Sequence, residues 1–219
     1  SERVILYLHG GSFVFRFPNA HAVLASRLCR RLGARALIPD YRLAPEHPFP
    51  AAPEDCHGAY RGLLAQGVLP ENIVLAGDSA GGNLALVTLH RARMAGEPLP
   101  RCAVLLSPAL DCTLGSPSMS LYDGEDPMIQ LSALLVLRRF CVPSPYEYTD
   151  PEVAPLFAEV ARFPPLLRQP PSVAMMPTTA AVIAASAAAM RGSRVTRSRC
   201  GAPRKMNTND GRNVAHAAS

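Results

Sequence analysis

A serine flanked by glycines is the clearest chemical feature of this 219-residue sequence. It lies in the segment Gly77-Asp78-Ser79-Ala80-Gly81, which follows the apolar run "NIVLA" and precedes an apolar segment with helical spacing. This is the G-x-S-x-G pattern of a nucleophile elbow, a sharp turn from strand to helix that exposes a serine hydroxyl. Side chains two residues to either side would collide in such a turn, which favours glycine at both places. The alternative, a glycine-rich turn with an incidental serine, is less consistent with this position between a strand and a helix.

A second glycine-containing segment, "YLHGGSF" at residues 7–13, also follows an apolar run. Parallel strands present their carboxyl ends at one edge of a sheet, where ligands bind in such folds, so both segments should open on the same side. Backbone N–H groups of Gly10, Gly11 and Ser12, together with that of Ala80, could then surround a developing oxyanion. Such preorganised donors contribute about 3 kcal/mol each. A tight glycine turn without a catalytic role is the alternative.

Apolar runs alternate with segments of helical spacing along residues 1–167. This alternation predicts an α/β fold with a mostly parallel sheet covered by helices on both faces. We expect one helix to be capped by Asn19 and closed by Gly33. The expected strands lie within 3–11, 34–43, 72–79 and 101–111, with a fifth near 167, and the expected helices cover 19–33, 54–66, 80–96 and 129–140.

The charge and composition change sharply near residue 168. Residues 1–167 hold 14 Arg against 16 Asp and Glu, whereas residues 168–219 hold seven Arg, one Lys and one Asp. The net charge of +5 therefore comes from the C-terminal segment, which also contains no Leu, Phe, Tyr or Trp. The main body is not a nucleic-acid binder by charge, and the basic segment has no aromatic residues to stack on bases. We interpret 1–167 as a partial catalytic core and 168–219 as an atypical basic tail.

Other features of the composition argue against a membrane anchor, disulfides and a metal site. The apolar run at 181–190 is too short to cross a bilayer, so no stable membrane anchor is predicted. Six cysteines without a CxxC pair favour free thiols in a reducing, cytoplasmic compartment over disulfides or a metal site. No metal or organic cofactor is implied.

Four segments together resemble the hormone-sensitive-lipase-like family of α/β-hydrolases, which includes bacterial carboxylesterases and lipases. They are "YLHGGSF", "DYRLAPEHPFPAAPED", "IVLAGDSAGGNLAL" and "VLLSPALDCT". The resemblance covers residues 1 to about 167 and implies ester cleavage by a Ser-Asp-His triad with Ser79 as the nucleophile. It places Gly10, Gly11, Ser12 and Ala80 in the oxyanion region, with Ser12 replacing the third glycine common in the family. The histidine that matches His9 organises the loop in this family and is not the base.

The histidine that would activate Ser79 is difficult to locate. His21 and His57 are expected on helices away from the strand ends, in surface or packing roles, and His90 is about 16 Å along the nucleophile helix. His47 lies in a proline-rich loop but precedes the serine, whereas the α/β-hydrolase order is Ser, acid, His. The sixth histidine, at position 216, follows in the required order.

The triad acid is equally difficult to locate. The place where the family carries it reads "RQPPSVAMMPTT" at 168–179 and contains no carboxylate. Asp126 precedes a predicted helix and is interpreted as a capping or loop residue. Asp210 and His216 form a formal pair, although incidental polar residues of a disordered tail are the favoured interpretation.

The sequence thus predicts an α/β-hydrolase core that is truncated at its start and lacks a recognisable C-terminal portion. The predicted function is hydrolysis of small carboxylic esters by serine acyl transfer. The alternative is a catalytically impaired fragment that at most binds acyl ligands. We expect residues 168–219 to be a disordered extension or, preferably, the product of a reading-frame shift in a GC-rich gene. Acyl-chain preference and oligomeric state do not follow from the sequence.

Overall fold

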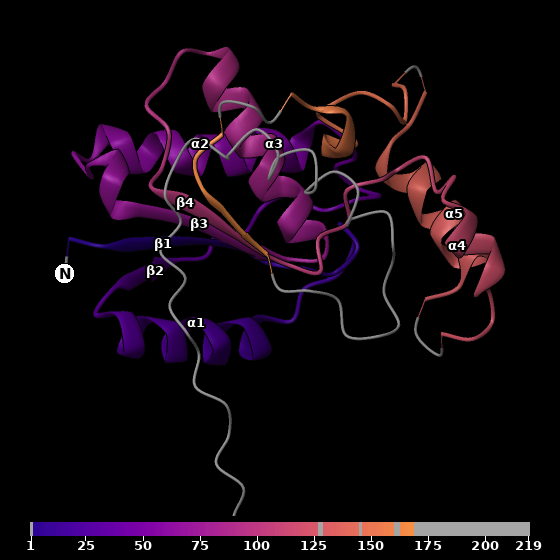
Figure 1. The fold of residues 1–219 in the computed structure, drawn as a ribbon, viewed down its shortest axis with the longest axis horizontal. Helices are drawn as coiled ribbons and strands as arrows, with labels where there is room; N and C mark the ends of the chain where they lie inside the picture. The colour runs from indigo at the N-terminus through magenta and orange to yellow at the C-terminus, as the bar shows by residue number, and fades with distance from the viewer. Residues whose placement is uncertain (1, 127–128, 145, 160–162, 169–219) are drawn as a thin grey trace, which may run out of the picture.

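The structure is a computed structural model that describes residues 2–126, 129–144, 146–159 and 163–168. Within these residues five strands form one parallel sheet in the order β2-β1-β3-β4-β5 (Figure 1). The central pair aligns Val4 with Ile73 and Leu8 with Gly77, so both strands end at the same edge. The strands are β1 (Val4–Leu8), β2 (Arg35–Leu37), β3 (Ile73–Asp78), β4 (Cys102–Leu106) and β5 (Leu166–Arg168).

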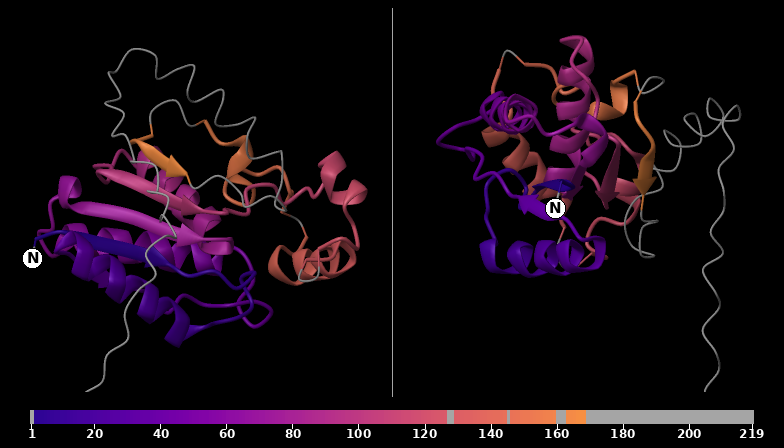
Figure 2. Two further views of the ribbon diagram at one scale, coloured as in Figure 1. Left: turned by 60° about the horizontal axis from the view of Figure 1, so that its bottom comes forward. Right: turned by 90° about the vertical axis from the view of Figure 1, so that its left-hand side faces the viewer.

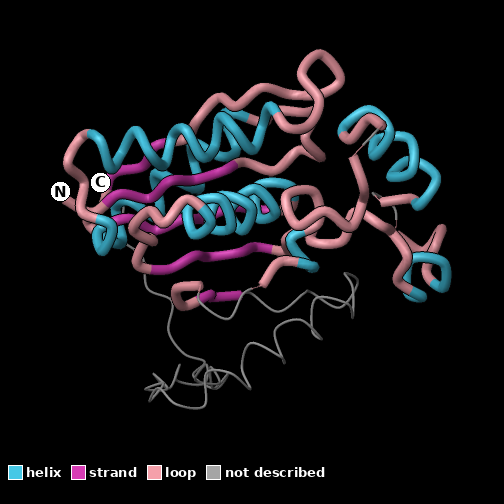
Figure 3. The backbone as a smooth tube through the Cα atoms, turned by 90° about the horizontal axis from the view of Figure 1, so that it is seen from above, coloured by secondary structure: helices cyan, strands magenta, loops and turns pink. Residues whose placement is uncertain are grey.

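Helices cover both faces of the sheet. Helix α1 (Pro18–Leu32) lies on one face, and α2 (Ala51–Ala65) and α3 (Ala80–Met94) lie on the other (Figures 1 and 2). Two further helices, α4 (Pro117–Leu121) and α5 (Leu131–Cys141), lie beyond the carboxyl ends of the strands (Figure 3). Two short 3-10 turns, η1 (Pro70–Asn72) and η2 (Pro155–Phe157), complete the described elements.

The alternation of side chains along β1 explains this layering. Val4, Leu6 and Leu8 are buried in the cluster formed with α2 and α3, whereas Ile5 and Tyr7 pack against the side of the sheet covered by α1. Successive side chains of a strand point to opposite faces, so a strand with helices on both sides must be apolar throughout. Burial of both faces fixes β1 and β3 in the middle of the sheet, where they carry the two glycine-containing segments to one edge.

The predicted elements are confirmed, with shifts at their ends. Helix α1 ends at Gly33 in the left-handed conformation, as expected, but the predicted cap at Asn19 is wrong. The helix begins at Pro18, because proline has the φ that the first helical position needs and lacks the N–H that a cap would satisfy. Helix α2 starts at Ala51 rather than at 54, and α4 was not predicted.

Candidate active site

Ser79 occupies the turn between β3 and α3 in a strained backbone conformation. Its φ is +50° and its ψ is −118°, a combination that side chains normally avoid. Its N–H donates to the carbonyl of Leu106 at 3.0 Å, and its carbonyl accepts the N–H groups of Gly82 and Ala109, both at 3.0 Å. Strained residues persist where surrounding bonds hold them, often at functional sites. The predicted strand-to-helix elbow is therefore present.

The two flanking glycines are required by close backbone contacts. A Cβ at Gly77 would strike the backbone of Gly81 and Gly82, and a Cβ at Gly81 would lie 2.7 Å from the carbonyl oxygen of His9. The first turn of α3 thus packs directly against the end of β1. This contact brings the elbow and the segment 9–13 to one place.

The loop after β1 supplies N–H groups beside the elbow, but not all four candidates remain available. The N–H of Gly10 donates to the carboxylate Oδ1 of Asp78 at 3.0 Å. In the part of the chain that the structure describes, the N–H groups of Gly11, Ser12 and Ala80 have no hydrogen-bond acceptor. These three are the candidate oxyanion donors.

Asp78 links the elbow to the loop, a role that the sequence analysis did not predict. Its Oδ1 also accepts the hydroxyl of Tyr7 at 2.8 Å and lies 3.4 Å from Nε2 of His21. Burial, followed by the neighbouring Asp78 charge, raises the pKa of Tyr7. Because Tyr7 and Gly10 come from β1 and its loop, one carboxylate holds both segments in register.

The expectation that His21 lies away from the strand ends is wrong. His21 is buried on α1, with its ring 5.5 Å from that of His9 and 6.0 Å from that of Tyr7. Its spacing of four residues from Ala25, the other buried residue of α1, was the sequence signal that could have placed it on the inner face.

His9 is fixed within the loop by Tyr41. The two rings stack with centroids 4.2 Å apart, and the Tyr41 hydroxyl donates to the carbonyl of His9 at 2.7 Å. His9 Nδ1 lies 2.8 Å from the carbonyl oxygen of Gly10, a contact that needs the ring proton on Nδ1. Burial lowers the pKa of His9, which favours the neutral ring. These contacts hold the ring within the loop, and the loop-organising role that the family resemblance implies for His9 stays a prediction.

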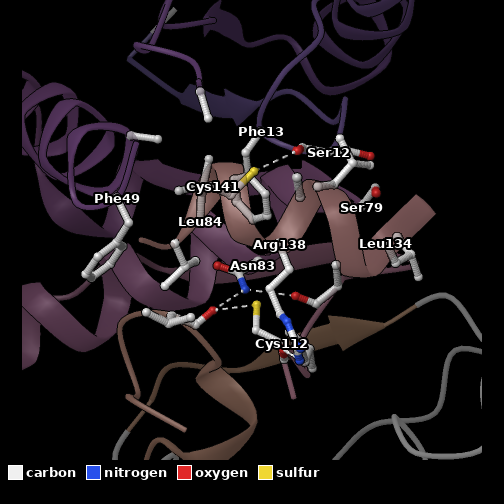
Figure 4. A pocket seen from close by; sticks show the side chains of 18 of the residues that line it. Ser12, Phe13, Phe49, Ser79, Asn83, Leu84, Cys112, Leu134, Arg138 and Cys141 are labelled. Carbon is white, nitrogen blue, oxygen red and sulfur yellow. Dashed lines mark hydrogen bonds between the residues drawn. The ribbon is translucent and has the colours of Figure 1, made fainter. Parts of the chain in front are cut away.

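A cavity of about 250 Å³ opens at the elbow (Figure 4). Ser12, Ser79 and Ala80 line it together, and Asn83 supports its wall by donating to the carbonyls of Ala109 at 2.8 Å and Val153 at 3.0 Å. Most of the other lining side chains are apolar. They include Phe13, Phe49, Leu84, Leu110, Leu134 and Leu137.

The described histidines do not complete a triad. None of them is hydrogen-bonded to the hydroxyl of Ser79 within the described ranges. His47 lines the cavity, whereas His57 is not part of its lining and contacts Glu97 at 2.7 Å. The interpretation of Asp126 as a loop residue is confirmed, since its Oδ1 accepts the N–H of Ile129 at 3.0 Å. Asp210 and His216 lie outside the described residues.

The described residues contain neither a metal-binding cluster nor a membrane-spanning helix. No group of three or more His, Cys, Asp or Glu side chains is arranged to hold a metal ion there. No helix in the described ranges has both the length and the apolar character needed to cross a membrane.

A strained serine at a strand-to-helix elbow of a parallel sheet, beside N–H groups without an acceptor among the described residues, is an arrangement typical of α/β-hydrolases. The family described as having the alpha/beta hydrolase fold matches residues 5–198, so the chain belongs to it. The match extends beyond the compositional boundary predicted at 168.

Relatives agree with this assignment. An esterase of Acinetobacter venetianus is 36% identical over 169 residues, which are 77% of this chain and 56% of the relative. An acetyl-hydrolase of Streptomyces hygroscopicus is 39% identical over 170 residues, which are 76% of this chain and 56% of the relative. The chain thus spans about half the length of these relatives.

Solved structures give the same result. The crystal structure of an esterase from the bacterial hormone-sensitive lipase family has a TM-score of 0.77 and 38% identity, over 86% of this chain and 63% of the other. The predicted resemblance to that family and the predicted fold class are confirmed.

Proposed function

We propose that this chain carries the nucleophile and the oxyanion site of a carboxylic-ester hydrolase. The observation that carries the proposal is that the strained Ser79 lines one cavity with Ser12 and Ala80. The N–H groups of these two residues, and that of Gly11 next to Ser12, have no acceptor within the described residues. Such donors stabilise an oxyanion because they are already oriented and need no rearrangement as charge develops.

The proposed reaction is acyl transfer. The Ser79 oxygen bonds to the ester carbonyl carbon and the carbonyl π electrons move onto oxygen. The hydroxyl proton passes to a general base, which the family resemblance implies to be a histidine. The resulting oxyanion re-forms the carbonyl as the alkoxide leaves with that proton. Water then releases the acid from the acyl-serine by the same sequence of steps. The apolar cavity lining favours small uncharged esters as substrates.

The test is hydrolysis of p-nitrophenyl acetate and butyrate by the full chain and by Ser79→Ala. We expect Ser79-dependent release of p-nitrophenol and a single fluorophosphonate adduct on Ser79 by mass spectrometry. Ser26→Ala, on the exposed part of α1, is the matched control and should behave as the unchanged chain. Hydrolysis that is unaffected by Ser79→Ala would overturn the proposal.

A second candidate function is binding of acyl ligands without turnover. It is favoured by one observation: no imidazole within the described ranges is paired with the Ser79 hydroxyl. Saturable binding of a butyrate ester without Ser79-dependent hydrolysis would support this candidate instead. The two functions therefore differ in one pair of measurements on the same protein.

A further inference from the structure

Ser12 has a backbone conformation that normally selects glycine. Its φ is +53°, in the left-handed region, and the next residue, Phe13, has a φ of +62°. A residue with a Cβ is disfavoured there relative to glycine, and a run of two such residues is unusual. The hormone-sensitive-lipase-like family commonly has glycine at this place, yet this chain carries a hydroxyl-bearing side chain.

Several bonds hold the loop in this conformation. The carbonyl of Gly11 accepts the N–H groups of Val14 at 3.0 Å and Phe15 at 2.8 Å. The carbonyl of Phe13 accepts the N–H of Ala44 at 3.0 Å, and the thiol of Cys141 donates to the carbonyl of Ser12 at 3.6 Å. The backbone bonds of the loop therefore determine where the Ser12 side chain lies, and no hydrogen bond of its hydroxyl to a described residue contributes.

The hydroxyl of Ser12 is available for a ligand. It has no hydrogen-bond partner in the part of the chain that the structure describes, and Ser12 is half-buried in the lining of the cavity that also contains Ser79. Figure 4 shows the two serines next to each other, one from the loop after β1 and the other from the elbow. A hydroxyl group can donate one hydrogen bond to an oxyanion.

We propose that the Ser12 hydroxyl is a catalytic group that donates a side-chain hydrogen bond to the oxyanion formed at Ser79, in addition to the backbone donors. This inference rests on the proposed function, since it needs an oxyanion at that place. The chain would thereby have an electrostatic contact that a glycine at position 12 does not supply. A hydrogen bond to a charged acceptor is stronger than one to a neutral carbonyl, so the contact acts mainly in the transition state.

The test compares Ser12→Ala and Ser12→Gly in the full chain. Both remove the hydroxyl, but only glycine also removes the Cβ and its conformational strain. We expect both variants to lower kcat for p-nitrophenyl butyrate by about tenfold or more, with KM unchanged, because the lost contact acts mainly in the transition state. Inhibition by butylboronic acid, which forms a tetrahedral adduct with a serine, should weaken by a similar factor. Ser26→Ala should leave kcat unchanged.

Four outcomes would overturn the inference. A Ser12→Gly variant with unchanged kcat beside an impaired Ser12→Ala would assign the effect to backbone strain. A raised KM with unchanged kcat would make Ser12 a ground-state contact. Unchanged kinetics in both variants would remove any role for the hydroxyl, while hydrolysis insensitive to Ser79→Ala would overturn the proposed function as well. Thermal unfolding of each variant identifies a loss caused by misfolding, and the Ser12→Gly variant is expected to fold because it relieves the strain.

Discussion

The carboxylate of Asp78 accepts the backbone N–H of Gly10 at 3.0 Å, although 68 residues separate the two in the sequence. Asp78 immediately precedes Ser79, the proposed nucleophile, and Gly10 immediately precedes Gly11 and Ser12, two of the candidate oxyanion donors. The bond therefore fixes the position of the loop relative to the elbow. It also removes the N–H of Gly10 from the four candidate donors predicted from the sequence.

Gly10→Ala should disrupt this junction. The added Cβ would strike the carboxylate of Asp78 and lie 2.9 Å from its backbone oxygen. We expect the free energy of unfolding, measured by urea denaturation, to fall by about 1–3 kcal/mol, as overpacking of a closely packed site does. The matched control is Gly58→Ala on α2, where nothing lies within 4 Å of the added Cβ. That change should raise stability by about 0.5–1 kcal/mol. Equal effects of the two substitutions would contradict the proposed contact.

Tyr7→Phe removes one of the donors to Asp78. The Tyr7 side chain is fully buried, and its hydroxyl bonds to a carboxylate at 2.8 Å. We expect a loss of about 1.5–3 kcal/mol, the range for hydrogen bonds to charged groups. A double-mutant cycle with Asp78→Asn should show a coupling energy above about 0.5 kcal/mol. Strict additivity would mean that the pair does not interact. Tyr122→Phe, at a largely exposed tyrosine, is the control.

Asn83→Asp should lower the free energy of unfolding more than Asn83→Ala does. Both amide hydrogens of Asn83 are used by carbonyls, and the side chain is 2% exposed. Alanine leaves two carbonyls without these bonds, at a cost of about 1–3 kcal/mol. Aspartate adds an unpaired buried charge facing them, for which about 3–5 kcal/mol is expected.

Lowering the pH should partly restore the stability of the Asn83→Asp variant. Burial beside carbonyls raises the folded-state pKa of the new carboxyl, so its destabilisation grows as pH rises above the unfolded value of about 3.9. The loss in free energy of unfolding caused by Asn83→Asp should therefore be smallest below that pH. A deficit independent of pH would show that charge is not its cause. Asn19→Asp, exposed in the first turn of α1, should not destabilise.

Three buried tyrosines should ionise only when the protein unfolds. Burial is the largest cause that raises the pKa of Tyr7, Tyr41 and Tyr60. Because the unfolded state loses these protons near pH 10 and the folded state retains them, stability should fall as pH rises above about 10. The chain has no tryptophan, so its near-ultraviolet absorbance follows tyrosine ionisation directly. Ionisation of all six tyrosines while circular dichroism remains native would refute the prediction.

The sequence determined the strands, the main helices and the elbow, because their signals are local. The apolar runs of β1 and β3, and the glycines at 77 and 81, act over a few residues and are read directly from the chain. Local signals also predicted the end of α1 at Gly33. They did not predict the start of α1. Pro18 and Asn19 are both residues that commonly begin a helix, and in the structure α1 begins at Pro18.

Only the tertiary structure decided how the site is held together. Asp78 with Gly10, Asn83 with Val153 and Cys141 with Ser12 are pairs separated by 68, 70 and 129 residues. No periodicity or motif encodes such pairs, since they form when parallel strands place distant loops at one edge of a sheet. The packing of α1 against the sheet likewise places His21 beside Asp78, although the sequence predicted a position away from the strand ends. The sequence thus determined which serine lies at the elbow, whereas the packing of β1, β3 and α1 decided which groups surround it.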